Sequence, residues 1–361
     1  MTTEYSETTG PVEFTSQTTG SSMTPSPSRG VGFYLECAVL VIGVVGTAAN
    51  ALVLYAMVVS KQHKKHKLIF NQNMLDLVGC FFLGATHAAK LCNVNLSGTQ
   101  GYWLCLLVFS EGSSWGPFVG SLVNLAAVTI ERYLKVVHHV WANKNLRDWM
   151  EYAAGSFAWV AGTVIAAAVT TNTTAVINGA CYSRVLWNSQ LARTAYWIWY
   201  ILSFYVVMLL IFIFCYGQIL MAIRHQARIM AAHNATGGPG PGSSDAQLKQ
   251  IQTDVIKTML LVSVLFAITW APANIFMFLN HVANVHPSKN AFYVIVFVSY
   301  LYLCINPFIY ATKFEPVKHV LVRLIPCNKA TQPPESIEMI APVRIQVVRA
   351  INITHCFMWC F

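Results

Sequence analysis

The chain has 361 residues, of which 55% are hydrophobic and only 10% charged. A typical soluble domain carries about a quarter charged residues, so this composition excludes an ordinary water-soluble enzyme. Lys and Arg outnumber Asp and Glu by 23 to 14. The charges are nevertheless too few, and the apolar runs too many, for the basic groove of a nucleic-acid-binding protein, so no nucleic-acid partner is expected.

Residues 1–31 form the first segment of the chain and are rich in Ser, Thr, Gly and Pro, with almost no large apolar side chains. This composition predicts a disordered extracellular N-terminus. The segment lacks a basic stretch followed by an apolar one, so we expect no cleavable signal peptide. The first apolar segment would then target the chain to the membrane.

Seven windows that contain no Asp, Glu, Lys or Arg follow. They lie between Glu36 and Lys61, Asp76 and Lys90, Glu111 and Glu131, Glu151 and Arg184, Arg193 and Arg224, Lys257 and Lys289, and Lys289 and Lys313. A helix of about 20 residues crosses the hydrocarbon of a bilayer. The second window reaches that length if its helix begins near Leu68, which places Asp76 inside the membrane. The windows are apolar on all sides, unlike the alternating strands of a membrane barrel. The prediction is an all-α membrane protein, a bundle of seven transmembrane helices over residues 32–312.

The cations set the orientation of these seven spans, because cytoplasmic loops are enriched in Lys and Arg. Most of them lie between spans one and two, three and four, and five and six, or after span seven. All four regions fall on one side of the membrane. We therefore expect a multi-pass protein with its N-terminus outside and its C-terminus inside.

Three cytoplasmic segments are predicted. Residues from about 229 to 250 contain the sequence ATGGPGPGSSD and form a flexible insert. Residues 313–327 form a short amphipathic helix, an eighth helix that lies on the membrane lipid and ends in Cys327, which is either S-palmitoylated or an exposed cytosolic thiol. Residues 328–361 form a cytoplasmic tail.

Cysteines and glycosylation sequons mark the outer side. Cys105, at the outer end of span three, and Cys181, in the loop after span four, are expected to form a disulfide, with Cys92 as a competing partner. Sequons place N-glycosylation at Asn95 and Asn172.

Polar motifs occur on each span in a fixed order. They are GTAAN at 46–50, NQNMLDL at 71–77, ERY at 131–133, Trp159, FCYG at 214–217, TWAP at 269–272 and NPFIY at 306–310. In identity and order they resemble those of the rhodopsin-like (class A) G-protein-coupled receptors, over about Phe33 to Cys327. The resemblance implies a plasma-membrane receptor of the orphan, peptide-receptor-like type that binds an extracellular ligand, activates a heterotrimeric G protein, has arrestin as a further partner and performs no catalysis of its own.

The resemblance implies an activation switch at the inner end of span three. Glu131 holds Arg132 at rest, beside Tyr133, and Arg132 swings towards Tyr216 and Tyr310 as span six moves outward. Simple anchoring of this ion pair at the membrane interface is the alternative. Where family members often carry an acidic residue at the base of span six, this chain has Gln252, so we expect raised basal activity.

Further residues are assigned to the switch and its partner by the same resemblance. Pro272 and Pro307 kink spans six and seven. Phe266 and Trp270 lie below the ligand cavity, Asn306 belongs to the motif of span seven, and Val140 contacts the G protein together with Arg132.

Asp76 is the residue at which the sequence suggests a bound ion. A carboxylate near mid-membrane either binds a cation or takes up a proton. The resemblance suggests a structural sodium ion with Ser121 as second ligand and Asn306 and Asn50 nearby, whereas a protonated Asp76 would hydrogen bond to both asparagines.

Two spans depart from the family pattern. Met208 replaces the usual proline of span five, so the local bulge is expected to be absent, which leaves the usual coupling of Met208 to Leu122 and Phe266 open. Cys105 lies two residues further from Arg132 than usual, and we expect residues 113–117 to absorb the difference.

The ligand class follows partly by exclusion. Residues 112–114 contain no Asp for an amine ligand, and Tyr300 replaces the lysine that retinal requires. The resemblance implies an upper cavity that includes Glu111, Ser114, Trp115, Tyr200, Asn274, Met277, Tyr293 and Tyr300. Its aromatic and amide groups favour a peptide or a neutral small molecule. Glu36 and Glu111 fit solvated charges at helix ends better than contacts to a cationic ligand.

Other classes of protein remain as alternatives. A transporter or channel would also carry charge inside the membrane, but neither repeat symmetry nor paired broken helices are visible in the sequence. A receptor-like protein that signals constitutively, or acts as a partner subunit, also fits.

Overall fold

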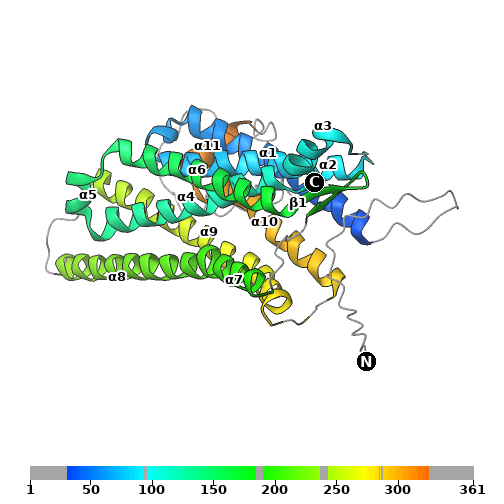
Figure 1. The fold of residues 1–361 in the computed structure, drawn as a ribbon. Coiled ribbons are helices and arrows are strands. Elements are labelled where there is room, and N and C mark those ends of the chain that lie inside the picture. Colours follow the sequence, from blue (N-terminus) through cyan, green and yellow to red (C-terminus); the bar gives the residue numbers. More distant parts are fainter. Residues whose placement is uncertain are drawn as a thin grey trace, which may run out of the picture.

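The computed structural model describes residues 31–92, 94, 96–183, 190–235, 243–283, 285 and 288–324. Long helices run side by side along one axis and form a bundle (Figure 1). The short helix α5 lies at one end of the bundle, and α3 lies at the other with the strand β1. The described part of the chain is thus a helical bundle with two distinct ends.

The elements follow in chain order. They are α1 (Val31–Val59), η1 (Gln62–Lys64), α2 (Lys67–Leu91), α3 (Gly98–Leu104), η2 (Cys105–Phe109), α4 (Gly112–Val137), α5 (His139–Asn145), α6 (Asp148–Thr173), β1 (Thr174–Ile177), β2 (Ala180–Ser183), α7 (Gln190–Ile201), η3 (Leu202–Val206), α8 (Val207–Ala235), α9 (Ser243–His281), α10 (Lys289–Lys313) and α11 (Glu315–Leu324).

Six helical segments of the described chain are long and apolar enough to cross a membrane. They belong to α1, α2, α6, the continuous run of α7, η3 and α8, α9, and α10, which are predicted spans one, two and four to seven. Span three corresponds to α4, whose 26 residues have the required length. The seven-helix fold predicted from the charge-free windows is therefore confirmed.

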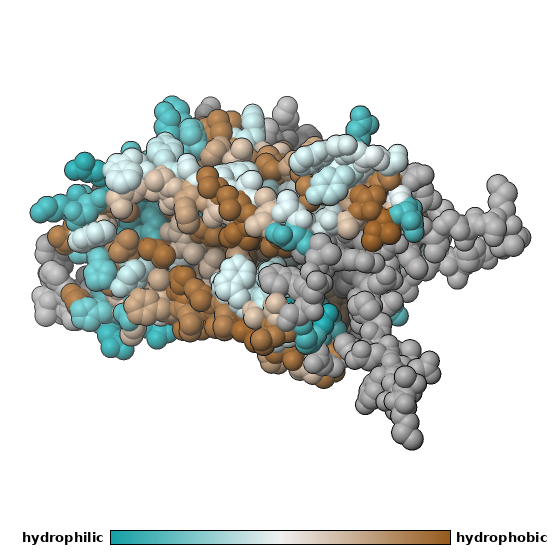
Figure 2. Space-filling view, viewed as in Figure 1, coloured by the Kyte–Doolittle hydropathy of each residue, from teal (hydrophilic) through white to brown (hydrophobic). Residues whose placement is uncertain are grey.

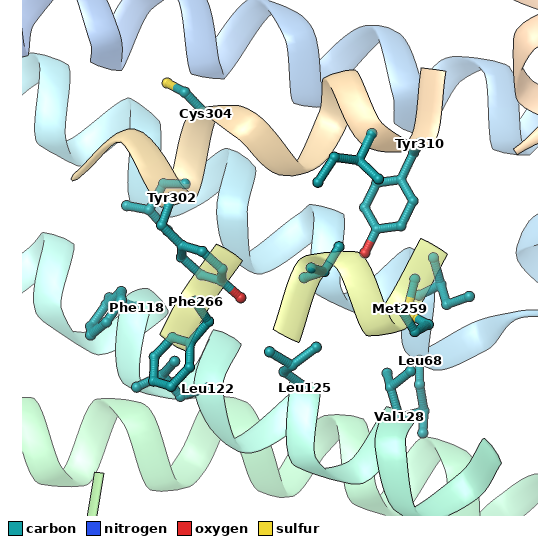
Figure 3. Packing of buried hydrophobic residues seen from close by; sticks show 14 of the residues in the cluster. Leu68, Phe118, Leu122, Leu125, Val128, Met259, Phe266, Tyr302, Cys304 and Tyr310 are labelled. Atoms are coloured by element: carbon teal, nitrogen blue, oxygen red, sulfur yellow. The ribbon is translucent and has the colours of Figure 1, made fainter. Parts of the chain in front are cut away.

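Helix α4 lies in the middle of the bundle and packs against α2, α6 and α8. Its buried apolar residues recur three to four positions apart, which places them along one face. Figure 3 shows Phe118, Leu122, Leu125 and Val128 on this face, near Met259 and Phe266 of α9 and Tyr302 and Tyr310 of α10. Met208 of α8 belongs to the same buried cluster as Leu122 and Phe266.

Helices α4 and α6 approach each other closely through glycine. A Cβ atom added to Gly162 would lie 2.3 Å from the carbonyl oxygen of Gly116 and 2.7 Å from the amide nitrogen of Gly120. No side chain fits between the two backbones at this point. Spans three and four are therefore in direct backbone contact.

A hairpin of β1 and β2 covers one end of the bundle. The strands are antiparallel, and Ile177 pairs with Ala180 across a two-residue turn. The turn residues Asn178 and Gly179 have φ angles of 51° and 76°, and Asn-Gly is the preferred sequence for such a turn. The hairpin presents Cys181, which forms the predicted disulfide with Cys105, while Cys92 is an exposed free thiol.

The structure has π-helical turns in spans three and five, and both differ from what the sequence predicted. In span three, residues 113–117 lie in regular helix, and the irregularity comes earlier, at η2 and at Glu111, whose φ is 63°. In span five, η3 forms a local bulge directly before α8 although proline is missing. A π-turn inserts one residue without proline, because it needs only a shifted hydrogen-bond pattern.

The surface and the cytoplasmic segments complete the fold. Figure 2 shows hydrophobic side chains across the middle of the visible face and hydrophilic ones at the end that carries α5. Outward side chains of α8 such as Ile213 are apolar and exposed, as a lipid-facing helix requires. Helices α8 and α9 extend to Ala235 and from Ser243, so helix covers both flanks of the predicted insert. Residues 313–327 contain α11, in which Val317 is buried, and Phe314 directly before it is buried too.

Candidate functional site

The inner end of span three places Arg132 between two partners. Its Nη2 atom lies 3.4 Å from Glu131 Oε1, which is the predicted resting pair. The same Nη2 donates to Nδ1 of His66 at 3.2 Å. Burial, and next the charge of Arg132, lower the pKa of His66 to about 3, so its imidazole is neutral at pH 7 and accepts this bond. His66 was missed by the sequence analysis and links Arg132 to the start of α2.

The inner ion network surrounds this pair. We use this name for Lys67, Glu131, Arg132, Lys135, Asp148 and Glu151. Lys135 pairs with Glu131 and lies 2.8 Å from Glu151, while Lys67 lies 2.8 Å from Asp148. The network therefore joins spans two, three and four.

The other switch residues lie deeper in the bundle. Tyr216 places its hydroxyl 3.3 Å from Thr129 Oγ1 and 3.4 Å from Ser263 Oγ, and Tyr310 is buried in the same core. Tyr133 hydrogen bonds to His138 at 3.1 Å. Arg132 thus contacts Glu131 and His66, and the hydroxyl of Tyr216 is bonded elsewhere. Val140, the predicted G-protein contact, is 71% exposed on α5.

Asp76 is fully buried and accepts hydrogen bonds from three side chains. Ser121 donates to Oδ1 at 2.7 Å, Gln72 to the same oxygen at 3.4 Å, and Asn306 to Oδ2 at 2.9 Å. Ser121 and Asn306 are the residues expected there. Asn50 instead donates to the carbonyl oxygen of Gly46 at 2.9 Å.

A chain of amides continues from Asp76 towards span four and was not foreseen. Asn124 donates to Gln72 Oε1 at 2.8 Å, and Asn71 donates to Asn124 Oδ1 at 2.8 Å. Trp159 Nε1 donates to Asn71 Oδ1 at 2.9 Å. The spacing of four residues between Gln72 and Asp76 on one helix was a signal that could have found the first link.

A small cavity lies between α2, α4, α9 and α10. Its volume is about 10 Å³, which is room for about one water molecule. The lining residues are Leu83, Ser114, Trp115, Phe118, Trp270, Tyr300 and Leu303. Ser114, Trp115 and Tyr300 are thus brought together as predicted. Phe118 stacks on Trp270 with ring centroids 4.2 Å apart, so the cavity floor is aromatic.

Tyr200, Asn274 and Met277 were also predicted to line the cavity, but they are not among its lining residues. Tyr200 packs against Tyr196, Trp197 and Phe204 in an aromatic group on α7 and η3. Asn274 is buried and donates to the carbonyl oxygen of Trp270 at 2.8 Å, one turn along α9. Met277 lies on the same helix.

Glu36 and Glu111, which were expected to be solvated, lie instead in a cluster of charged side chains that we call the outer charge cluster. The outer charge cluster consists of Glu36, His87, Lys90, Glu111 and Tyr300. Glu111 pairs with Lys90 and accepts a hydrogen bond from Tyr300, and His87 lies between the two carboxylates, with Nδ1 bonded to Glu36 and Nε2 3.9 Å from Glu111. The side chain of Glu111 is only 20% exposed, because the turn at η2 and the left-handed backbone of Glu111 direct it into the bundle. The cluster joins spans one, two, three and seven.

Some predicted positions fall outside the described residues. These are Asn95, Cys327 and the side chains of Gln252 and Tyr293. Asn172, the other predicted glycosylation site, is exposed in the last turn of α6.

The described geometry defines a class of protein: a helical membrane protein with a buried carboxylate in mid-bundle and an Arg–Glu pair at one end of its central helix. The family model described as "7 transmembrane receptor (rhodopsin family)" matches residues 49–310. The chain therefore belongs to this receptor family, as the motifs predicted.

Named relatives are similar to the chain at low identity. Melanopsin of Felis catus is 23% identical over 324 residues, which cover 82% of this chain and 61% of the relative. Somatostatin receptor type 3 of Mus musculus is 24% identical over 290 residues, with 77% of this chain and 65% of the relative covered. The KiSS-1 receptor of Mus musculus is 23% identical over 305 residues, with 81% and 74% covered. The chain spans less than two thirds of the length of the first two.

Proposed function

We propose that this protein is a plasma-membrane receptor that transmits the binding of an extracellular ligand to a heterotrimeric G protein. The observation that carries the proposal is Arg132, held by Glu131 and His66 at the inner end of the central helix. A ligand that favours the state in which Arg132 leaves these partners shifts the equilibrium towards an open inner face. Catalysis is limited to promoting nucleotide exchange on the G protein, and arrestin is a further partner.

The N-terminus lies outside the cell in this proposal. Two features support the orientation. The disulfide between Cys105 and Cys181 lies at the opposite end of the bundle from Arg132, and disulfides persist in an oxidising exterior. Lys and Arg are concentrated at the Arg132 end, as is usual for cytoplasmic loops. Asn95 and Asn172 then carry glycans, and Cys327 a palmitoyl group on the inner leaflet.

The ligand is a peptide or a neutral small molecule. The cavity beneath the outer end is lined mostly by apolar and aromatic side chains, with Ser114 and Tyr300 as its polar groups. Tyr300 has no amine with which to form a Schiff base, so light sensing by retinal chemistry is not part of the proposal.

A sodium ion is proposed to compete with a proton at Asp76. The residues fit such an ion, because Asp76 and Ser121 supply oxygen atoms and the buried Oδ1 of Asn306 has no hydrogen-bond partner among the described residues. In this proposal sodium chloride raises the thermal midpoint of the wild-type protein more than choline chloride does at equal ionic strength. Asp76→Asn abolishes the difference, and an equal effect of both salts on the wild type would argue for the proton.

The receptor function is tested by G-protein activation in cells that express the intact chain. Because the base of span six carries Gln252 instead of an acid, we expect a basal signal above that of mock-transfected cells. Arg132→Ala should reduce this signal to the mock level while surface expression is retained. Lys318→Ala, a change at an exposed ion pair on α11, serves as the matched control and keeps the basal signal. Wild-type activity that survives Arg132→Ala would contradict the proposed switch.

A further inference from the structure

The charge balance of the outer charge cluster is uneven. It contains two carboxylates, Glu36 and Glu111, and one permanent cation, Lys90, with His87 between the acids. The side chains of His87 and Lys90 are 5% and 12% exposed. Carboxylates in such surroundings require compensation by a positive group or by several hydrogen bonds. The cluster is therefore suited to a cation.

The cluster continues directly into the cavity through Tyr300. This residue donates a hydrogen bond to Glu111 and also lines the cavity. Trp115, Phe118 and Trp270 also line the cavity, and aromatic side chains attract a positive charge. A group that is bound to Glu111 and extends along Tyr300 would meet these rings.

Two buried polar atoms at this place support a ligand site independently of the acids. Ser114 is 5% exposed and lines the cavity, and its Oγ has no hydrogen-bond partner within the described chain. Nε2 of His87, which is 4% exposed, likewise accepts or donates no hydrogen bond there and faces Glu111. Buried polar atoms are nearly always bonded in a complete structure, so both point to a bound polar group.

Lys90 occupies the position that such a group would take. It comes from the last turn of α2 and reaches Glu111 with its ammonium group. The cavity of about 10 Å³ admits only a water-sized group, so a larger ligand must displace a side chain to enter. A long lysine at a helix end can move to the surface, where its ammonium group is hydrated, once another cation takes its place at Glu111.

We propose that Glu111 binds the guanidinium or ammonium group of an extracellular peptide in exchange for Lys90. Tyr300 continues to donate to the carboxylate, and the aromatic cavity receives the neighbouring part of the peptide. The proposal rests on the proposed receptor function and names the ligand class of that receptor. It replaces the expectation that Glu111 is a solvated charge.

The test uses the purified full-length receptor and two defined probes. One probe is a mixture of tripeptides, acetylated and amidated at their ends, with Arg fixed at the central position and neutral residues elsewhere. The other contains citrulline, which has nearly the shape of arginine without its charge. Binding is measured as the rise of the thermal midpoint with probe concentration. The arginine mixture should act at concentrations at least about tenfold lower than the citrulline mixture.

Three variants separate the site from other causes. Glu111→Gln should remove the preference for arginine. Lys90→Met, which leaves Glu111 without its internal partner, should increase the affinity for the arginine mixture by about tenfold. Glu315→Gln, a change at an exposed carboxylate on α11, is the control and keeps the wild-type preference.

The outcomes distinguish this site from the receptor function. Equal shifts with both mixtures, no shift with either, or a preference that survives Glu111→Gln in folded protein would overturn the site. Basal nucleotide exchange that depends on Arg132, without preference for arginine, would leave the receptor function intact and exclude the site. A preference for arginine without any nucleotide exchange on a G protein would support the site at Glu111 and contradict the receptor function.

Discussion

The outer charge cluster and the inner ion network both hold helices together through charge, but with a different balance of charge. In the inner network Asp148 is 89% exposed and Lys135 is 35% exposed, but the other four side chains are exposed by 10% or less. In the outer cluster Glu36 is 29% exposed, and the other paired side chains are exposed by 20% or less. Burial therefore does not separate the two groups, but charge balance does: Glu131 and Glu151 are each paired with two permanent cations, whereas Glu111 is paired with one.

The two groups also differ in the helices that they join. The outer cluster connects spans two and three to spans one and seven, whereas the inner network connects spans two and three to span four. Spans two, three and four are further linked by the hydrogen bonds that run from Gln72 through Asn124 and Asn71 to Trp159. A change at the outer cluster therefore acts on spans one and seven relative to a central unit of three helices.

The largest effect is expected from breaking the outer cluster. Lys90→Met leaves the buried Glu111 carboxylate without its cation and should lower the free energy of unfolding by about 3 kcal/mol. Thermal unfolding in detergent measures the change. Lys318→Met, at an exposed pair, is the control, and adding Glu111→Gln to Lys90→Met should restore most of the loss. A loss that the second change does not reduce would mean that the charge of Glu111 is not its cause.

A smaller effect is expected from pH at the inner end. The pKa of His66 is about 3 in the folded protein, against 6.5 for an unperturbed histidine, so the unfolded chain binds the proton first as the pH falls. This group therefore lowers stability as the pH falls below 6.5, by about 1 kcal/mol between pH 7 and about 5.5. His66→Gln should reduce the pH dependence of the thermal midpoint over this range.

The exposed His319 on α11 provides the control for this pH dependence. His319→Gln should keep the wild-type profile. If His66→Gln has the same profile as the wild type, the imidazole of His66 is not the titrating group.

The smallest effect is expected from the exposed side of the inner network. Lys135→Ala removes ion pairs to Glu131 and Glu151, but Arg132 and Lys67 remain paired with these two carboxylates. The cost should be about 0.5 kcal/mol and should disappear in concentrated salt. Urea unfolding at low and high ionic strength measures it. A cost that equals that of Lys90→Met would abolish the distinction between the two groups.

Much of this structure follows from the sequence for definite physical reasons. Charge-free windows predict the spans because charges are costly in hydrocarbon, and all seven were found in this way. The pairing of Cys105 with Cys181, and the approach of Ser121 and Asn306 to Asp76, also agree with the expectation. Trp115 and Tyr300 meet at the cavity because regular helix connects each of them to its motif.

The rest depends on backbone geometry that the sequence does not reveal. Glu111 was expected in water because it stands at the end of a charge-free window. Its burial comes from η2 and from its own left-handed backbone, neither of which has a residue signature here. His66 was missed because its role requires the start of α2 to lie beside Arg132, a contact between residues 66 positions apart.

The π-turns have a consequence for any residue-by-residue comparison with relatives. One additional residue in a helix rotates everything beyond it by about 100° relative to an uninterrupted helix. Positions on the outer side of η2 or η3 therefore cannot be matched, by counting from Arg132 or Tyr216, to those of a receptor that lacks the same turn. Tyr200, assigned by such counting, stands beyond η3 and contacts its own aromatic neighbours. An alignment of this chain with a receptor that lacks one of these turns needs a gap inside that span.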